Sequence, residues 1–214
     1  KPLGMGCMTT AAKLKKISWR ELEPAARQMA TLNDKACEAM HAAGAHACTD
    51  ITGFGLIGHS MNIARASDLA FEVRVADVPL FPGALELARK SLFSGGAKRG
   101  RATLGPEVEI GGGLEEARVN LLFDAETSGG LLIVLPEAHA AALERELVAR
   151  ELPVVRIGRF DAYRGKRPRR FGGDAALDVA PDVEGETDIL GRRQGREQIV
   201  LLEDEADMPS PVAR

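Results

Sequence analysis

The stretch Thr49-Asp50-Ile51-Thr52-Gly53-Phe54-Gly55-Leu56-Ile57-Gly58-His59 places an acid, a glycine-interrupted turn and a helical pattern in direct succession. A helix that begins here has backbone N–H groups without intrahelical partners, and these groups and the helix dipole favour phosphate. Glycines without a Cβ let a ligand approach the backbone, and an acid beside the turn suits Mg²⁺, which takes carboxylates together with substrate phosphates. The stretch therefore predicts a strand, a turn and a helix that bind an anion. The simpler alternative is an Asp that caps a helix behind an ordinary glycine turn.

Two further motifs accompany this stretch. The chain opens with Lys1-Pro2-Leu3-Gly4-Met5-Gly6, and Phe123-Asp124-Ala125-Glu126-Thr127-Ser128-Gly129-Gly130-Leu131-Leu132 follows later. Together the three motifs resemble the C-terminal half of selenophosphate synthetases (selenide, water dikinases), whose segments are K-P-L-G-x-G, T-D-I-T-G-F-G-L-I-G-H and D-x-Q-T-S-G-G-L-L. The resemblance extends from Lys1 to about Ala162. Related enzymes that make aminoimidazole ribonucleotide, phosphorylate thiamine phosphate or mature hydrogenase share the fold.

The resemblance implies a reaction and roles for particular residues. The reaction converts ATP, selenide and water to selenophosphate, AMP and phosphate. Asp50 is implied to hold Mg²⁺ on the ATP phosphates. Two turns are implied to offer backbone N–H groups to phosphate or to the product, namely Thr52, Gly53 and Gly55, and Thr127, Ser128, Gly129 and Gly130. The family's reactive Cys or selenocysteine belongs to the N-terminal half, so no catalytic residue is expected in this chain, and the full-length enzyme is expected to be a homodimer.

Three segments are expected along the chain. Residues 1–16 are interpreted as a connector from a missing N-terminal domain, residues 17–163 as a synthetase-like domain and residues 164–214 as a disordered tail of low hydrophobicity and mixed charge. Within the tail only residues 199–202 have a strand pattern, so deleting residues 165–214 is expected to leave the core nearly as stable. The order of elements, roughly α-α-β-α-β-α-β-β-α-β, predicts an α/β (α+β) two-layer sandwich with a mixed sheet. The resemblance implies the same fold, that of the C-terminal domain of aminoimidazole ribonucleotide synthetase-like enzymes.

Several segments have an expected local structure. Ser18 followed by Glu21 indicates a capping box that opens a helix, and Trp19 is expected in the core rather than as a ligand platform. Ser94–Arg101 is expected to be a flexible basic loop, in which a phosphate contact by Arg99 is less favoured than solvation. Val119–Phe123 is expected to be a strand, and the apolar run Leu131–Leu135 a strand covered on both faces.

His59 and the three cysteines have simple expected roles. A packed or capping His59 is favoured over a catalytic one. Cys7, Cys37 and Cys48 are an odd number without a C-x-x-C pair, which indicates neither a disulfide framework nor a zinc site. Each is interpreted as a small buried hydrophobe. Cys7 has no neighbouring His in the sequence, and we do not expect it to be the nucleophile.

Composition narrows the possible partners. The chain has 214 residues, of which 45% are hydrophobic and only 4% aromatic, and its formal net charge is −3. This net charge gives no reason to expect binding to nucleic acid or to an anionic membrane. The low aromatic content also argues against a surface on which bases stack. The sequence has no apolar run of membrane-spanning length and no signal-peptide pattern, so a cytoplasmic location is expected. Because the chain lacks an initiator Met, it is interpreted as the C-terminal piece of a longer protein.

Two alternative functions stay open at this point. One is another ATP-using enzyme of the same superfamily, and the other is a non-catalytic binding or assembly module. A Cys or selenocysteine followed by Lys upstream of Lys1, in a glycine-rich segment, would favour the synthetase. Residues 1–214 alone are expected to form no AMP from ATP and selenide, because the N-terminal half supplies the nucleophile and most of the ATP site.

Overall fold

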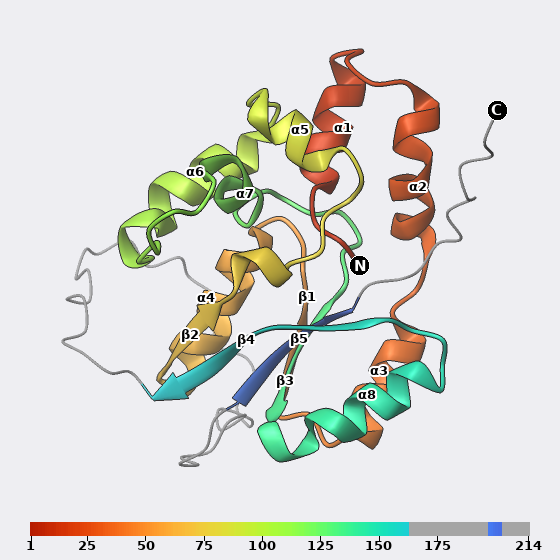
Figure 1. The fold of residues 1–214 in the computed structure, drawn as a ribbon, viewed down its shortest axis with the longest axis vertical. Coiled ribbons are helices and arrows are strands. Elements are labelled where there is room, and N and C mark those ends of the chain that lie inside the picture. Colours follow the sequence, from red (N-terminus) through yellow and green to blue (C-terminus); the bar gives the residue numbers. More distant parts are fainter. Residues whose placement is uncertain (163–196, 203–214) are drawn as a thin grey trace, which may run out of the picture.

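The sheet at the centre of the molecule has five strands, each antiparallel to its neighbours (Figure 1). The computed structural model describes residues 1–162 and the backbone of residues 197–202. The strands lie in the order β1-β3-β5-β4-β2. Their bounds are Ala47–Asp50 for β1, Leu69–Val73 for β2, Leu131–Pro136 for β3, Val154–Ala162 for β4 and Glu197–Leu202 for β5.

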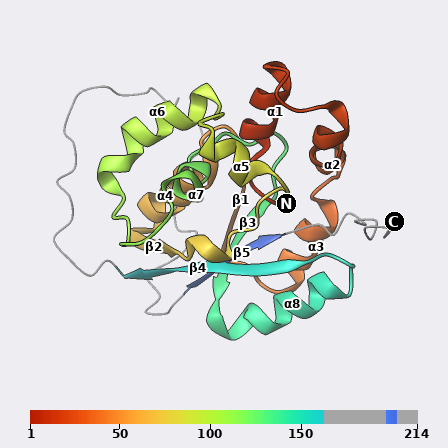
Figure 2. The same cartoon turned by 45° about the horizontal axis from the view of Figure 1, so that its top comes forward.

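Helices cover both faces of this sheet (Figures 1 and 2). Helices α3 (Asp34–Ala42) and α8 (Ala140–Val148) lie together on one face, and α4 (Gly55–Ser67) packs on the other. The remaining α-helices lie on the α4 side, with bounds Met5–Lys13 for α1, Trp19–Ala30 for α2, Ala84–Arg89 for α5, Gly95–Leu104 for α6 and Glu116–Leu121 for α7. The described part of the chain also has three short 3₁₀ helices, η1 (Val75–Asp77), η2 (Gly105–Glu107) and η3 (Glu137–His139).

Strand β3 has both of its faces buried. Leu132 and Val134 belong to the core between the sheet and α4, whereas Leu131, Ile133 and Leu135 belong to the core that α3 and α8 form. Successive side chains of a strand point to opposite faces, so a strand between two helical layers has apolar residues at every position. The expectation of a strand covered on both faces is confirmed.

The α+β class is confirmed, but two details of the expected architecture are wrong. The sheet is not mixed, because all four strand pairings are antiparallel. Helix α4 connects β1 with β2, and these strands lie at opposite edges of the sheet, so this βαβ succession creates no parallel neighbours. The architecture also has helices on both faces rather than two layers.

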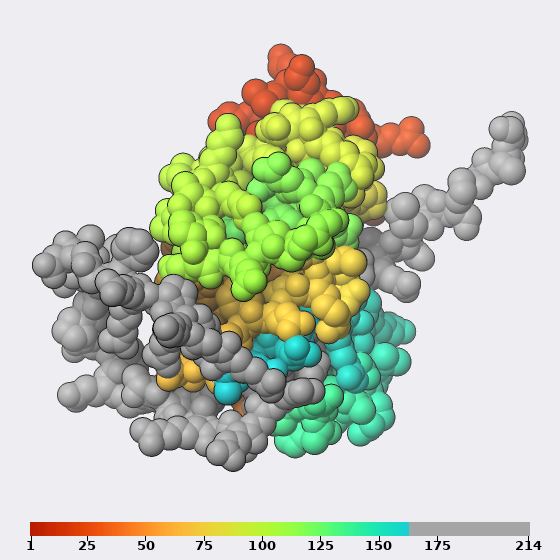
Figure 3. Space-filling view, turned by 60° about the vertical axis from the view of Figure 1, so that its left-hand side comes forward, coloured from red at the N-terminus to blue at the C-terminus, as the bar shows by residue number. Residues whose placement is uncertain are grey.

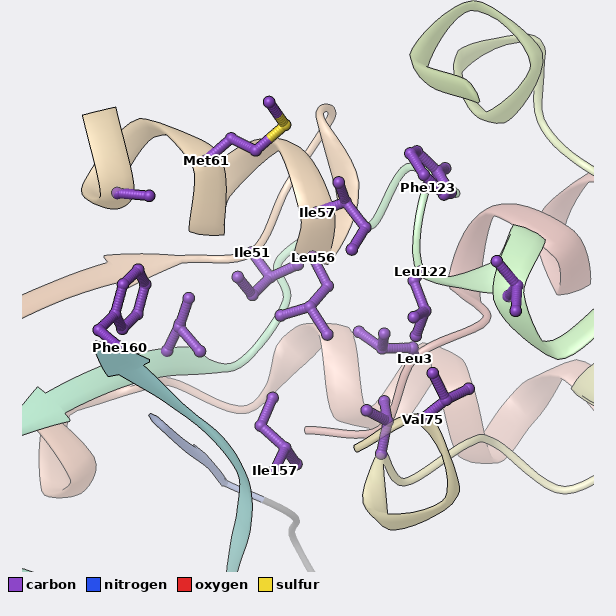
Figure 4. Packing of buried hydrophobic residues seen from close by; sticks show 14 of the residues in the cluster. Leu3, Ile51, Leu56, Ile57, Met61, Val75, Leu122, Phe123, Ile157 and Phe160 are labelled. Carbon is purple, nitrogen blue, oxygen red and sulfur yellow. The ribbon is translucent and has the colours of Figure 1, made fainter. Parts of the chain in front are cut away.

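The main core lies between α4 and the sheet and includes residues from all three sequence motifs (Figure 4). Ile51 follows β1, Leu56 lies in the first turn of α4, and their side chains lie close together. Leu3 of the first motif and Leu122, just before the third, lie beside each other in the same cluster. Burying one such side chain stabilises the fold by about 1.5–3 kcal/mol. The apolar members of the motifs therefore hold the motifs together.

The N-terminal segment is part of the folded core rather than a connector over its whole length. Residues Met5–Lys13 form α1, and the side chains of Leu3, Met5, Cys7 and Met8 are buried. The backbone N–H of Leu3 donates to the Pro79 carbonyl oxygen at 2.9 Å. The small and polar residues that suggested a connector instead allow α1 to pack closely against α5 and α2.

The expectations for Ser18, Trp19 and Val119–Phe123 have different outcomes. The capping box of Ser18 and Glu21 is confirmed, but Trp19, expected in the core, is 66% exposed. Trp19 does lie in a helix, as the spacing of apolar residues predicted. That spacing cannot show which part of the helix is covered by a neighbouring element. Residues Val119–Phe123 are not a strand, because α7 ends at Leu121 and turns follow it. A short apolar run cannot distinguish a buried strand from a buried helix.

The segment Ser94–Arg101 is a helix rather than a flexible loop. Ser94 is the N-cap of α6, and its Oγ accepts a hydrogen bond from the Ala97 N–H at 3.2 Å. Figure 3 shows α5, α6 and α7 across the upper part of one face of the molecule. The serine cap supplies the start signal that offsets the poor helix propensity of Gly95 and Gly96.

The C-terminal segment supplies a central strand. Residues Glu197–Leu202 form β5, which pairs with β3 on one side and β4 on the other. For these residues the expectation of disorder is wrong. Deleting residues 165–214 would also remove the strand between β3 and β4, so both neighbours would lose their backbone pairing with it. Residues 163–196 and 203–214 lie outside the described residues.

Candidate functional site

The second and third motifs meet through the pairing of β1 with β3. Asp50, the last residue of β1, lies opposite Leu131. The Ile51 N–H donates to the Gly130 carbonyl oxygen at 2.9 Å, and the Glu126 N–H donates to the Thr52 carbonyl oxygen at 3.0 Å. The acid, the first turn and the T-S-G-G turn, which are far apart in sequence, therefore form one backbone unit.

Asp50 is exposed at the edge of this unit. Its carboxylate has no hydrogen bond or ion pair to the residues that the structure describes. No group of three or more His, Cys, Asp or Glu side chains suited to a metal ion occurs within residues 1–162. A single carboxylate still fits Mg²⁺, because this ion keeps several waters and takes its other ligands from substrate phosphates. Asp50 can therefore contribute one ligand to a metal that a nucleotide helps to hold.

The two glycines of the first turn have different environments. Gly53 is exposed, and a Cβ added there would have no atom within 4 Å, so its backbone is open to a ligand. Gly55 is buried with φ +66°, and its N–H already donates to the Thr52 carbonyl oxygen at 3.0 Å. A Cβ on Gly55 would lie 2.8 Å from the Asp124 carbonyl oxygen. Gly55 thus permits close packing and has no N–H free for a phosphate.

The T-S-G-G turn is also divided between an open half and a buried half. Thr127 and Ser128 are exposed, whereas Gly129 and Gly130 are buried. A Cβ on Gly129 would overlap the Ile51 carbonyl oxygen, and the carbonyl oxygens of Ser128 and Gly129 accept hydrogen bonds from Lys1 Nζ (2.8 Å) and Asn33 Nδ2 (3.0 Å). The hydroxyl residues can face a ligand, and the glycines join the two motifs.

Two buried acids of the third motif bind the N-terminal segment. The carboxylate oxygens of Glu126 accept hydrogen bonds from the N–H groups of Gly4 (2.7 Å) and Met5 (3.0 Å) at the start of α1. Burial raises the pKa of Glu126 to about 8. The two hydrogen bonds act in the opposite direction, because they favour the charged carboxylate. Glu126 occupies the position at which the resembled family segment has Gln. No local pattern in the sequence indicates this contact, because Glu126 and Met5 are 121 positions apart.

Asp124 binds the start of α6 in the way that Glu126 binds the start of α1. Its Oδ1 accepts hydrogen bonds from the N–H groups of Ser94 (3.1 Å) and Ala125 (3.0 Å). Burial raises the pKa of Asp124, and its side chain is fully buried. A Cβ on Gly6 would lie 2.7 Å from the same Oδ1, so the first motif has glycine where it touches this carboxylate. Asp124 thus ties α1, α6 and the third motif together.

The start of α6 lies beside the first turn, which the sequence did not predict. A Cβ on Gly96 would lie 3.6 Å from the Gly53 carbonyl oxygen and 3.2 Å from the Ala125 Cβ. The Arg99 Nη1 lies 3.2 Å from the Cβ position of Gly95, so this exposed guanidinium folds back toward the start of its own helix. A cation and a helix N-terminus at one place both favour an anion. A capped helix start could have been found from Ser94-Gly95-Gly96, but its position beside Gly53 could not.

His59 is packed under the first turn, as favoured. It is 9% exposed, and its Nε2 accepts a hydrogen bond from the Thr52 N–H at 3.1 Å. Its ring contacts Phe54 edge-on at 5.9 Å between centroids, and Phe54 is 67% exposed. Burial lowers the pKa of His59, and the nearby Asp50 charge opposes this shift. The imidazole is therefore neutral at physiological pH.

Cys7 has none of the properties of a reactive thiol. It is fully buried in α1, and burial together with the charges of Asp124 and Glu126 raises its pKa to about 12. A thiol acts as a nucleophile through its thiolate, which is scarce at this pKa. Its expected role as a small buried hydrophobe is confirmed. Cys37 and Cys48 are free thiols of intermediate burial, so they are less enclosed than expected.

A large hollow lies elsewhere in the molecule. It has a volume of about 1010 Å³ and is lined by α4, β2 and the segment 107–114, without any of the predicted site residues. Two of its acids, Glu72 and Glu107, are paired with Arg159 and Arg65. This hollow is therefore separate from the site around Asp50.

The fold and these motifs define a known class of domain. The chain belongs to the family described as AIR synthase related protein, C-terminal domain, which matches residues 1–169. In the ranges 1–162 and 197–202, no helix has both the length and the apolar character needed to cross a membrane.

Similar curated proteins carry the name selenide, water dikinase. The chain is 39% identical over 172 residues to the one from Caldanaerobacter subterraneus subsp. tengcongensis, covering 80% of this chain and 48% of the relative. It is 38% identical over 140 residues to the one from Clostridium botulinum Eklund 17B, covering 65% of this chain and 41% of the relative. For the one from Sulfurovum sp. NBC37-1 the identity is 35% over 158 residues, covering 74% and 45%. The chain thus spans about half the length of the curated relatives it matches.

Proposed function

We propose that this chain is the C-terminal part of a selenide, water dikinase, which converts ATP, selenide and water to selenophosphate, AMP and phosphate. The observation that carries the proposal is the meeting of the second and third motifs at one exposed carboxylate. Asp50 lies at the end of β1, next to the first turn and the T-S-G-G turn, which are joined by the hydrogen bond from the Ile51 N–H to the Gly130 carbonyl oxygen. Relatives of that name are 33–39% identical to this chain over the residues that they match.

In this proposal the chain binds the phosphates of Mg²⁺-ATP. Phosphoryl transfer needs positioning and charge neutralisation more than covalent chemistry from the protein. Mg²⁺, when bound through Asp50, would supply that neutralisation. Gly53 would offer open backbone, and Thr127 and Ser128 would offer exposed hydroxyls. The start of α6 with Arg99 adds a site of positive potential beside Gly53, so an anion can be held from two sides.

The remaining glycines have a supporting role in the proposal. Gly55, Gly129 and Gly130 were expected to contact the ligand, but each is buried against backbone of the neighbouring motif or inside the turn. They let the two turns approach closely enough for both to reach one nucleotide. Ligand contact is therefore assigned to the exposed Thr127, Ser128 and Gly53, together with the half-buried Thr52.

Partners and location follow from the same proposal. ATP and selenide would be the substrates, and the half of the enzyme that this chain does not match in its relatives would supply the reactive Cys or selenocysteine. We also propose a cytoplasmic homodimer for the whole enzyme. The alternatives are another ATP-using enzyme of the superfamily, which would need a different acceptor than selenide, and a non-catalytic module, which would support no turnover.

A chimera tests the proposal directly. Residues 1–214 would replace the matching half of the Caldanaerobacter subterraneus enzyme, and selenide-dependent release of AMP from ATP would be measured. We expect turnover by the chimera and none by the 214-residue chain alone. A chimera that melts cooperatively and binds ATP but forms no selenide-dependent AMP would overturn the proposal. Turnover by the chain alone would overturn the division of labour between the halves.

A further inference from the structure

His59 connects two residues that lie on either side of Asp50. Its Nε2 lies 3.1 Å from the Thr52 N–H nitrogen, and its Nδ1 lies 3.4 Å from the Thr49 Oγ1. Thr49 Oγ1 in turn lies 3.1 Å from the Asp50 carbonyl oxygen. One ring from the second turn of α4 thus spans the bend at which β1 ends and the first turn begins.

The donors and acceptors in this chain of contacts determine the direction in which each hydrogen bond is donated. The Thr52 N–H can only donate, so Nε2 must be the unprotonated nitrogen of a neutral ring. The proton of the neutral imidazole is then on Nδ1, from which it donates to Thr49 Oγ1. The Thr49 hydroxyl keeps its own proton for the Asp50 carbonyl oxygen. The Thr52 Oγ1 also lies 3.1 Å from Nε2, and its hydroxyl can donate to the same unprotonated nitrogen. The reversed direction would place an Nε2–H against the Thr52 N–H.

We infer that His59, as the neutral Nδ1–H tautomer, is the positioning residue that fixes the Asp50 backbone and thereby aims its carboxylate. The inference rests on the proposed function only where it takes Asp50 to be a metal ligand. Asp50 is exposed and has no side-chain hydrogen bond among the described residues that could orient it. Its direction must come from the backbone. His59 binds the Thr52 N–H beyond Asp50 and contacts the Thr49 Oγ1, which donates to the Asp50 carbonyl oxygen.

A histidine that only fills space would leave the backbone bonds unaffected when replaced by another well-packed side chain. The local packing favours a more specific role, because the Phe54 ring covers one edge of the imidazole while both nitrogens have polar partners. Ile51 between them is anchored separately through the Gly130 carbonyl oxygen at 2.9 Å. Ile51 therefore offers an internal control, because its amide does not depend on His59.

The test is amide hydrogen exchange and imidazole ¹⁵N spectroscopy on the 214-residue chain. We expect His59 to have the Nδ1–H tautomer at neutral pH. In His59→Leu, exchange of the Thr52 amide should accelerate by about fivefold or more, because the lost hydrogen bond acts directly on local opening. His59→Gln keeps a side-chain acceptor and should restore most of the protection. His41→Leu, which changes an exposed histidine in α3, is the matched control.

The outcomes separate this inference from the proposed function. An Nε2–H tautomer, or equal acceleration of the Thr52 and Ile51 amides in His59→Leu, would overturn it, because the change would then be a general loss of stability. Mn²⁺, used as a paramagnetic probe, should broaden the Gly53 amide signal in the parent and in His59→Gln, and less in Asp50→Asn and His59→Leu. If Asp50→Asn responds to Mn²⁺ like the parent, the metal role of Asp50 fails, while the tautomer and exchange results still decide the role of His59.

Discussion

The acids of the second and third motifs look alike in sequence but have opposite environments. Asp50 follows a strand, is exposed and has no side-chain partner among the described residues. Asp124 and Glu126 are buried. Glu126 accepts two N–H groups at the start of α1, and Asp124 accepts one at the start of α6 and one from Ala125. A buried carboxylate that accepts backbone N–H groups holds segments of the fold together, and one that is left exposed and unpaired at a turn can serve a ligand.

The same contrast divides the glycines of the two turns. Gly53 has open space around it, whereas Gly129 lies against the Ile51 carbonyl oxygen. We therefore expect Gly129→Ala to destabilise the chain by about 4 kcal/mol or more, because a backbone group must move, and Gly53→Ala to stay within about 0.5 kcal/mol. Urea melts of the two variants and the parent measure this difference. Equal stability of the two variants would mean that the motifs are not joined at Gly129.

Asp50→Asn should act on turnover and leave stability unchanged. Asn keeps the shape of Asp but removes the charge, so in the chimera we expect selenide-dependent AMP formation to fall about 100-fold and to need more Mg²⁺. Unfolding free energy should change by less than about 0.5 kcal/mol, since Asp50 is exposed. If Asp50 only caps a helix, Asn serves almost as well, and activity within about twofold of the parent would show this.

Glu126→Ala should have the reverse pattern. The N–H groups of Gly4 and Met5 would lose their acceptor inside the protein, which costs about 2–3 kcal/mol. Glu137→Ala, at an exposed position in η3, is the control and should cost little. The Mg²⁺ dependence of the chimera should be the same with and without Glu126→Ala, when assayed well below its melting temperature. A changed Mg²⁺ dependence would place Glu126 in the ligand site and remove the contrast with Asp50.

The smallest expected effect is a pH dependence of stability. Burial raises the pKa of Glu126 from its usual 4.5 to about 8, so the folded state holds this proton more tightly than the unfolded state. Its contribution is complete below pH 4.5 and is lost as the pH rises through 8. Between about pH 7 and pH 9 we expect the parent to lose on the order of 1 kcal/mol, and Glu126→Gln to lose less.

This pH window also avoids a contribution from His59. The pKa of His59 is lower in the folded state than its unfolded value of 6.5. Its contribution to stability is therefore complete above pH 6.5 and is lost only as the pH falls through the folded-state pKa. Asp124, whose pKa is also raised by burial, acts in the same direction as Glu126 and remains in both proteins. Stability of the parent that rises between pH 7 and pH 9 would contradict the assignment of a retained proton to Glu126.

Much of the local structure could be predicted from the sequence. The α+β class, the strand over Leu131–Leu135 and the capping box at Ser18 all depend on neighbours in the chain, because period and capping are local properties. The secondary-structure predictions that were wrong concern segments whose local sequence pattern is ambiguous. Ser94–Arg101 is glycine-rich and basic yet helical, and the short apolar run at Val119–Phe123 fits a strand or a helix equally well.

What the sequence by itself determined is therefore the set of motifs, their order and the elements next to them. Only the tertiary structure decided which members of those motifs face solvent and which join the motifs. Asp50 and Glu126 are both acids beside a turn, and their difference depends on contacts across many residues, such as that between Glu126 and Gly4, 122 residues apart. Strand order was decided in the same way, since β5 lies between β3 and β4. Burial and pairing are properties of the assembled fold, because they depend on which distant segments occupy the surrounding space.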